Sequence, residues 1–482
     1  MRRGLPVLYL LALTICVAAC TVGPHYARPA TDTPPAYRGA DNSAVSSAAS
    51  SPQGSAASLG DEKWAEVFKD ATLQELIREA LANNYDVKIA AERVLEQQDQ
   101  VGITRAQQFP TVSGGGSYTA IGLPSSLAST LNQGRSTSFA TRYYSGGFTL
   151  SAAWNLDFWG LYRRQTEAAR AQLLATEWGR RLTLSTVVEN VATAYLLLRT
   201  LDAELEITKH TVEARKQSLQ LTQTLEEGGA TSLADVRQAE ELLYTAEAAI
   251  PDFERQIQQQ ENSISILLGR NPGPIIRGTG DMEWPQPEEV PAGIPSQLLE
   301  RRPDIQQAEA ELFAANANIG VAKAQLFPQL SLSGTGGTSS DQLKGLVDSK
   351  NLYWYATGNL TQIIFDGGRL RNNLKLTEAQ KQEQVLTYQQ TIKKAFESVS
   401  DALIGLEKFR QYREKEEQLT EAAKGAADLA RIRYHGGSTS YLEVLATDTD
   451  YFSAQLALAT AREGEAISNV QLYSALGGGW QQ

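Results

Sequence analysis

Cysteine and histidine are scarce in this chain, and their scarcity excludes several kinds of site. The 482 residues include two cysteines, Cys16 and Cys20, and three histidines, His25, His210 and His435. Cys16 falls in a predicted leader, so the mature chain keeps one cysteine and can form neither an internal disulfide nor a thiolate metal cluster. The three histidines are too widely scattered to hold a metal ion. We therefore expect no metal site.

A surplus of positive charge is also missing. The chain has 44 Lys and Arg against 55 Asp and Glu, a formal net charge of −11 that becomes −13 when Arg2 and Arg3 leave with the leader. This balance argues against a nucleic-acid partner, because phosphates attract Lys and Arg surfaces. The sequence also lacks a G-x-S-x-G elbow, a P-loop, an H-E-x-x-H motif and a Cys/His cluster. We expect no catalytic residues and no enzymatic activity.

Long apolar runs are absent after the leader. No later stretch of about 18 uninterrupted apolar residues exists, so no predicted helix spans a bilayer. Any crossing of a membrane must use strands.

The N-terminus has the pattern of an export signal followed by a lipid attachment site. Residues 1–19 contain two arginines, an apolar stretch and then small residues before Cys20. The run Val17-Ala18-Ala19-Cys20 resembles a lipobox, which predicts a diacylglycerol and an N-acyl chain on Cys20, a durable anchor. By resemblance to bacterial lipoproteins, Thr21 is compatible with sorting to the outer membrane. The alternative is an ordinary secretory signal with an incidental cysteine.

The chain contains its own copy. The segment 101–117 matches 319–335, with Phe109-Pro110 repeated 218 residues later, and 228–236 matches 436–444 at an offset of 208. We expect the following organisation: signal peptide 1–19, lipidated segment and linker 20–60, first repeat 61–271, linker 272–295, second repeat 296–478 and tail 479–482.

Each repeat is expected to contain a pair of strands. The first pair is predicted at about 111–119 and 143–154, the second at about 329–336 and 352–364. Apolar and polar residues alternate along them, so that each strand has an apolar face and a polar face. This pattern suits a membrane barrel with a wet lumen. A half-buried soluble sheet would show the same alternation.

A long helical hairpin follows each strand pair, at about 163–268 and 369–476. The first helix has no proline from 163 to 227, which at 1.5 Å per residue is about 100 Å. Its apolar residues largely follow a seven-residue repeat, the pattern of supercoiled helices. A generic coiled coil is the alternative, but such a coil does not explain why each helix is attached to a strand pair. Pro251 should break or kink the returning helix, whereas Ala459 occupies that place in the second repeat.

Four strands cannot close a barrel, and open strand edges are not tolerated in lipid. Two chains would give eight strands whose side chains nearly fill the interior, whereas three give twelve and leave a lumen. We therefore predict an α+β membrane channel. In it, three internally duplicated chains form a twelve-stranded barrel, four strands per chain, continuous with a long coiled-coil barrel, which the family resemblance described next implies is periplasmic.

The sequence resembles the TolC-like outer-membrane factors, and most closely their OprM-like (NodT) lipoprotein branch. Its most specific motif is Leu-Leu-Glu-Arg-Arg-Pro-Asp-Ile at 298–305, where Pro303 and Asp304 should begin a helix. Four further motifs lie at 20–29, 80–86, 364–371 and 475–480. The resemblance implies the exit channel of a tripartite efflux system in the outer membrane, working with a periplasmic adaptor and an inner-membrane pump of the resistance-nodulation-division type. It does not identify the exported cargo.

The resemblance also places the candidate site at the two Gly-Gly turns, which in the family close the tunnel and meet the adaptor. In the family, an acid at the position of Glu443 faces the pore. Tyr434 matches a tyrosine that holds the inner hairpin closed by contacting an acid at the position of Asp235. This chain has Ala446 at the position of the family's second pore acid. It has Thr439 at the position of the arginine that supports the latch. The expected adaptor-contacting residues are Gly228, Gly229, Thr231, Ser232, Gly436, Gly437, Thr439 and Ser440.

Structural roles are open for the same side chains. Ser232 with Asp235, and Ser440 with Glu443, both have the spacing of a capping box. Tyr434 fits packing against the tip as well as it fits a latch. Two other functions also remain open, a periplasmic adaptor and a lipoprotein enzyme, although an adaptor would have one hairpin rather than two.

Overall fold

The computed structural model describes residues 21–39, 58–122, 124, 142–278 and 295–481. Cys20 and the leader lie outside these residues. The chain divides into two compact units. Unit 1 comprises residues 1–29, 95–174 and 310–386, and unit 2 comprises 30–94, 175–309 and 387–482. Among the described helices, none is both long enough and apolar enough to cross a membrane.

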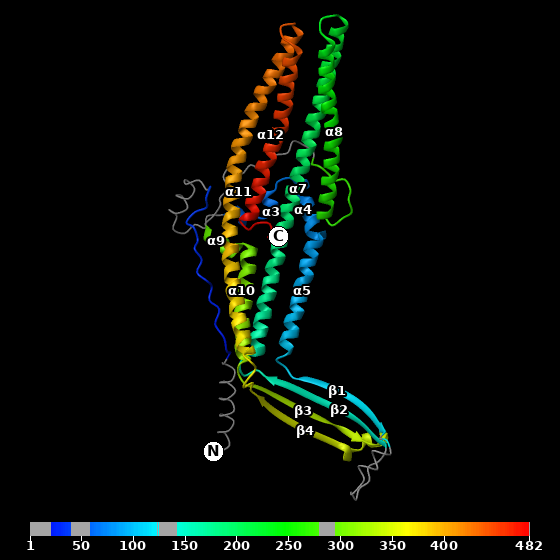
Figure 1. Cartoon of the computed structure of the whole chain (residues 1–482), viewed down its shortest axis with the longest axis vertical. Helices are drawn as coiled ribbons and strands as arrows, with labels where there is room; N and C mark the ends of the chain where they lie inside the picture. The colour runs from blue at the N-terminus through cyan, green and yellow to red at the C-terminus, as the bar shows by residue number, and fades with distance from the viewer. Residues whose placement is uncertain (1–20, 40–57, 123, 125–141, 279–294, 482) are drawn as a thin grey trace. The chain divides into compact units, whose positions relative to one another are not determined.

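A four-stranded antiparallel sheet is the main feature of unit 1. Its strands are β1 (Thr111–Gly122), β2 (Arg142–Leu156), β3 (Gln329–Ser340) and β4 (Leu352–Thr361), and they lie in the order β1-β2-β3-β4. Figure 1 shows them side by side. Two 3₁₀ turns, η2 (Leu343–Val347) and η3 (Ser349–Asn351), join β3 to β4. The outer edges of β1 and β4 have no partner strand within the described chain.

The register assigns the two faces of the sheet by residue number. Pairs such as Thr149 with Gly337, and Gly337 with Tyr353, join odd to odd, and even numbers pair with even numbers throughout. Because successive side chains point to opposite faces, all odd-numbered residues share one face. The even face carries Phe148, Leu150 and most of the other apolar side chains.

The strand ends differ from the predicted ones. β1 and β3 extend to Gly122 and Ser340, beyond their predicted ends. The glycines in these strands carry no side chain, so they obscure the alternation of apolar and polar residues. β4 ends at Thr361, so the prediction that it reaches residue 364 is wrong. Thr361 pairs with Gln329, the first residue of β3. Proline precedes Gln329 and has no N–H to extend the ladder.

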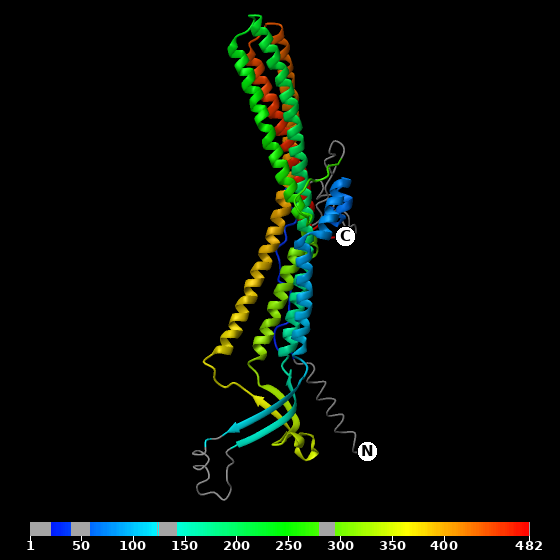
Figure 2. The ribbon, with the colours of Figure 1, turned by 90° about the vertical axis from the view of Figure 1, so that its right-hand side faces the viewer.

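Three pairs of corresponding helices in the two repeats have equal lengths. Helices α5 (Tyr85–Ala106) and α10 (Pro303–Ala324) each have 22 residues, and α10 begins at Pro303 as predicted. Helices α7 (Leu161–Glu227) and α11 (Arg369–His435) each have 67 residues. The returning helices α8 (Leu233–Leu267) and α12 (Tyr441–Ala475) each have 35. Figures 1 and 2 both show α8 running back beside α7, and α12 beside α11.

Helix α8 runs without interruption through Pro251. Of the break or kink that was predicted there, the break is therefore wrong. The lost backbone bond of one proline costs about 3 kcal/mol. The apolar contacts of the long hairpin, with Leu243, Ala246 and Ile257 all buried, can offset that cost.

The core of unit 2 lies where the long helices meet several short elements. These are η1 (Leu59–Asp61), α3 (Trp64–Val67), α4 (Ala71–Asn83) and α9 (Pro295–Arg301). The cluster includes Tyr195, Ile77, Leu298 and Tyr473, each almost fully buried. The many buried positions of α7 in this cluster include Leu184, Val187, Val191, Leu198 and Leu201, which the seven-residue repeat had predicted to face a neighbour.

The Arg-Arg-Pro-Asp motif fastens the end of α12 to this core. Arg302 donates to both carboxylate oxygens of Asp304, at 3.0 and 2.8 Å, and to the carbonyl oxygen of Ala475 at 2.7 Å. Arg301 pairs with Asp61 at 2.6 Å. Arg302 thus satisfies one of the carbonyls that a helix leaves free at its C-terminus.

Candidate functional site

Both hairpin tips are built by the same backbone turn. Gly229 and Gly437 have φ values of +75° and +70°, so each turn contains one left-handed residue. The N–H of Ala230 bonds to the carbonyl of Leu225, and the N–H of Ser438 bonds to that of Arg433. These bonds close the last turn of α7 and of α11 in a Schellman motif. Glycine is needed for its conformation alone, because a Cβ on either residue would meet no atom within 4 Å.

The first tip contains a complete capping box. The Oγ of Ser232 accepts from the N–H of Asp235 at 3.3 Å, and Oδ2 of Asp235 accepts from the N–H of Ser232 at 3.1 Å. The hydroxyl of Thr231 donates to the same carboxylate, and this bond is the main reason that the pKa of Asp235 is lowered. Asp235 is therefore engaged by its own turn.

The second tip lacks that box, so the capping-box prediction for Ser440 and Glu443 is wrong. The side chain of Ser440 makes no capping bond. Glu443 instead accepts from the hydroxyl of Thr439 and from Nη1 of Arg433, the latter at 2.6 Å. The longer Glu side chain reaches the last turn of α11, where Arg433 supplies a charged donor that competes with the backbone N–H.

Tyr434 packs against the second tip. Its ring lies 5.3 Å from that of Tyr441, centroid to centroid, beside a buried cluster that includes Ala430 and Val444. Within the described residues, its hydroxyl is buried and has no hydrogen-bond partner. The described partners of Asp235 are Thr231 and Ser232. Within one chain Tyr434 therefore packs, and no bond to Asp235 is formed.

A buried charge cluster joins the two hairpins, and the sequence analysis missed it. Nε of Arg215 on α7 donates to Asp448 on α12 at 3.0 Å, and Arg431 on α11 donates to the other oxygen of that carboxylate. Arg215 also donates to the carbonyl of Leu242 on α8, so four helices meet here. Arg215 and Asp448 are 4% and 7% exposed.

The sequence feature that could have predicted this cluster is a row of polar residues at one position of the seven-residue repeat of α7. Thr208, Arg215 and Thr222 follow one another at seven-residue steps, and all three are buried. A search for apolar heptads passes over such a row. An arginine in a buried heptad position needs a counter-charge from a facing helix, because an unpaired buried charge is very costly.

A second unexpected feature is a pair of carboxylates between α7 and α12. Burial, and to a lesser extent the charge of Glu463, raise the pKa of Glu204 to about 7. Burial likewise raises the pKa of Glu463. The hydroxyls of Thr460 and Thr200 donate to Glu204 and Glu463 respectively and oppose these shifts. The helix contact therefore includes an acid that gains a proton near neutral pH.

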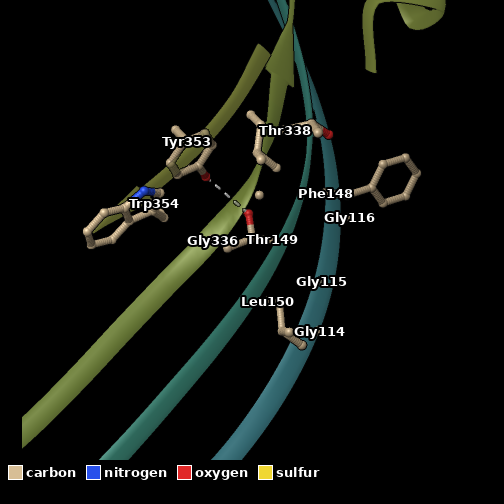
Figure 3. A pocket seen from close by; sticks show the side chains of 12 residues that line it. Gly114, Gly115, Gly116, Phe148, Thr149, Leu150, Gly336, Thr338, Tyr353 and Trp354 are labelled. Carbon is tan, nitrogen blue, oxygen red and sulfur yellow. Dashed lines mark hydrogen bonds between the residues drawn. The ribbon is translucent and has the colours of Figure 1, made fainter. Parts of the chain in front are cut away.

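The sheet of unit 1 has its own candidate surface. Glycines of β1 and β3, at 114–116 and 336–337, leave a hollow of about 740 Å³ lined also by Phe148, Leu150 and Trp354. Figure 3 shows Tyr353 reaching toward Thr149, while Phe148 points away from that pair. The Tyr353 and Thr149 hydroxyls are 3.4 Å apart. The side chain of Tyr353 thus passes over Gly337, which lies between Tyr353 and Thr149 in the sheet and has no side chain.

The family model described as "Outer membrane efflux protein" matches residues 76–270 and 294–478. The chain belongs to the outer membrane efflux protein family. The two matched segments are separated by 271–293. As a member of this family the chain is a transport component and not an enzyme.

Relatives of the efflux protein match over nearly its whole length. The solvent efflux pump outer membrane protein SrpC of Pseudomonas putida is 35% identical over 99% of this chain and 98% of its own. The cation efflux system protein CusC of Escherichia coli O6:H1 is 32% identical over 99% of both chains. A crystal structure of CusC, described as forming a transmembrane channel, has a TM-score of 0.83 and 30% identity over 95% of this chain and 100% of that one.

These similarities confirm the predicted fold class, an α+β channel of the trimeric outer-membrane type. They also confirm the predicted function. The efflux protein is the outer-membrane channel of a tripartite efflux system, with a periplasmic part, and it conducts substrates passively to the outside.

Proposed function

We propose that this chain acts as a lipid-anchored homotrimer that receives its cargo through a periplasmic adaptor from an inner-membrane pump of the resistance-nodulation-division type. The observation that carries the proposal is the pairing, in one chain, of a sheet with two open edges and two hairpins of equal length. Three such chains supply six hairpins of equal length, and neighbouring sheets can satisfy the edge N–H and C=O groups of β1 and β4.

The anchor is a diacylglycerol and an N-acyl chain on Cys20. Support comes from the lipobox-like sequence and from the outer-membrane relatives. Mass spectrometry of the N-terminal peptide from native membranes should find Cys20 as the first residue, carrying acyl chains. An uncut or unmodified N-terminus would contradict the anchor and leave the channel function unaffected.

The adaptor is proposed to contact the tips, at Gly228, Gly229, Thr231 and Ser232 in the first hairpin and at Gly436, Gly437, Thr439 and Ser440 in the second. The two turns share one backbone shape, so six similar tips in a trimer would offer a repeated surface to a ring of adaptor subunits. Asp235, Tyr434 and Glu443 are proposed to border the aperture between the tips.

The pump, rather than this channel, determines which molecules are exported. Relatives at similar identity, 35% and 32%, carry names that refer to solvents and to cations. We propose that the channel accepts whatever class of molecule its pump delivers. Cross-linking the native complex and identifying the pump that co-purifies would name that class.

The aperture is tested by the salt bridge of the second tip. If Glu443 borders the aperture, Glu443→Gln should reduce the cation preference of single channels in planar bilayers, because rings of carboxylates favour cations. Arg433→Gln is the matched control. It frees the Glu443 charge from its ion pair and should increase cation preference. Unchanged reversal potentials in both variants would remove Glu443 from the aperture.

A further inference from the structure

The odd-numbered face of the sheet is polar and carries no charge. Its residues in β1 to β4 are Ser, Thr, Tyr, Asn and Gln, with three glycines, Ile121 and Ala153. None is Asp, Glu, Lys, Arg or His, although Asp, Glu, Lys and Arg together make up 21% of the chain. On the even face, the one ionisable charge is that of Arg142, the first residue of β2.

Hydroxyl groups on this face bond to each other across the strands. The hydroxyls of Ser151 and Thr335 are 3.3 Å apart, and those of Thr149 and Tyr353 are 3.4 Å apart. Cross-strand hydroxyl pairs of this kind contribute to the stability of a sheet. They hold the side chains against the sheet while leaving acceptor lone pairs free for a solute.

Two aromatic rings lie among these hydroxyls. The rings of Tyr353 and Tyr355, successive odd residues of β4, are 6.4 Å apart between centroids and nearly parallel, with an interplanar angle of 11°. Their side chains are 37% and 55% exposed. Aromatic rings at such a separation form an offset pair whose outer faces can receive another flat ring.

We propose that the odd-numbered face lines the exit passage and contacts passing solutes through hydrogen bonds and aromatic rings rather than through charge. This inference rests on the proposed homotrimer, in which the apolar even face meets lipid and the polar face meets the lumen. The solutes that this wall retains are uncharged molecules with hydroxyl groups and an aromatic ring. Ions of either sign pass it without attraction or repulsion from a fixed side-chain charge, so any charge selectivity arises elsewhere in the channel.

Cysteine substitution tests the orientation of the wall. The natural sequence has cysteine only at positions 16 and 20, so a new cysteine in a strand is easily distinguished. Ser333→Cys and Leu332→Cys are neighbours on opposite faces of β3. A water-soluble cationic thiol reagent should lower the conductance of the Ser333→Cys trimer in a planar bilayer and leave the Leu332→Cys trimer unchanged.

The same variant tests the absence of fixed charge. Cationic and anionic thiol reagents on Ser333→Cys should shift the reversal potential in opposite directions by similar amounts, because no native charge on the wall biases either one. Conductance that is insensitive to both reagents, with mass spectrometry confirming modification, would overturn the lining. Inserted trimers that carry no current at all would instead contradict the channel function.

Ring contact is tested with phenyl β-D-glucoside, an uncharged aromatic solute with several hydroxyl groups. It should cause brief current blocks in the wild-type trimer and in Trp354→Leu, a control on the even face. The double variant Tyr353→Leu, Tyr355→Leu should lose most of these blocks. Equal blocking in all three proteins would overturn the role assigned to the two tyrosines.

Discussion

The first and second hairpins of this chain have the same dimensions and different tip chemistry. Helices of 67 and 35 residues are joined in both by a turn with one left-handed glycine. At the first tip a carboxylate caps its own helix, whereas at the second a carboxylate bonds to Arg433 on the preceding helix. The backbone of the tip is therefore common to the two copies, and the side chains can differ without changing it.

The contrast extends along the hairpins. Asp448 in the second repeat is buried against two arginines, while its counterpart 208 residues earlier, Glu240, forms an exposed pair with Arg237. Ala423 stands in the second repeat where Arg215 stands in the first. The first copy thus carries a buried arginine, and the second copy supplies the aspartate that neutralises it.

The largest effect is expected from breaking this buried cluster. Asp448→Ala leaves Arg215 buried without its counter-charge and should destabilise the contact between the hairpins by about 3–5 kcal/mol. Glu240→Ala is the matched control and should cost no more than about 0.5 kcal/mol, as for other exposed helix pairs. Hydrogen exchange of α12 near residue 448 would measure the difference. Equal protection in the two variants would show that the cluster does not hold the hairpins together.

A smaller effect is expected from the caps. Ser232→Ala removes a capping bond and should destabilise the start of α8 by about 1 kcal/mol. Ser440→Ala removes no such bond from α12 and should change little. Hydrogen exchange of the first turn of each helix checks the pair, and a larger effect at Ser440 would reverse the comparison drawn between the tips.

At neutral pH the smallest effect is that of the carboxylate pair, and it appears as a dependence of stability on pH. The pKa of Glu204 is raised to about 7 in the folded chain, so the protonated form is favoured by folding. Its contribution is therefore fully present below the unfolded pKa, near 4.5, and is lost as the pH rises through about 7. Protection of the α7–α12 contact should fall between pH 5 and pH 8. Glu204→Gln should flatten that dependence, and a profile identical to wild type would assign it to other groups.

Backbone features were the part of the structure most open to prediction from sequence. The repeated Gly-Gly pairs permit a left-handed turn, Pro303 fixes φ at a helix start, and the long runs without proline allow an uninterrupted helix, so no distant residue is needed to interpret them. Strand ends were harder, because glycines in β1 and β3 carry no side chain to reveal a face. Pro251 does not end its helix, because packing along the hairpin outweighs the loss of one backbone bond.

Side-chain partners were the part that local patterns could not supply. Ser440 and Glu443 have the spacing of a capping box, but the spacing says nothing of Arg433, which lies ten residues before Glu443 and competes for it. The partner of Arg215 is 233 residues away on another helix. Such pairs depend on which helices face each other, so they follow from the fold and not from the pattern around either residue.

The odd-to-odd register of the sheet limits how this sequence can change in length. A one-residue insertion inside any strand would move every following side chain of that strand to the opposite face. Changes of length within a strand must therefore come in pairs, whereas the connections between strands are free of that rule. β3 follows β1 at an even offset of 218 residues, and most of its hydroxyl side chains therefore keep odd numbers. An odd offset would have placed the polar residues of β3 at even numbers, but the same side chains would still share one face of the sheet. The physical constraint therefore acts on changes of length within each strand.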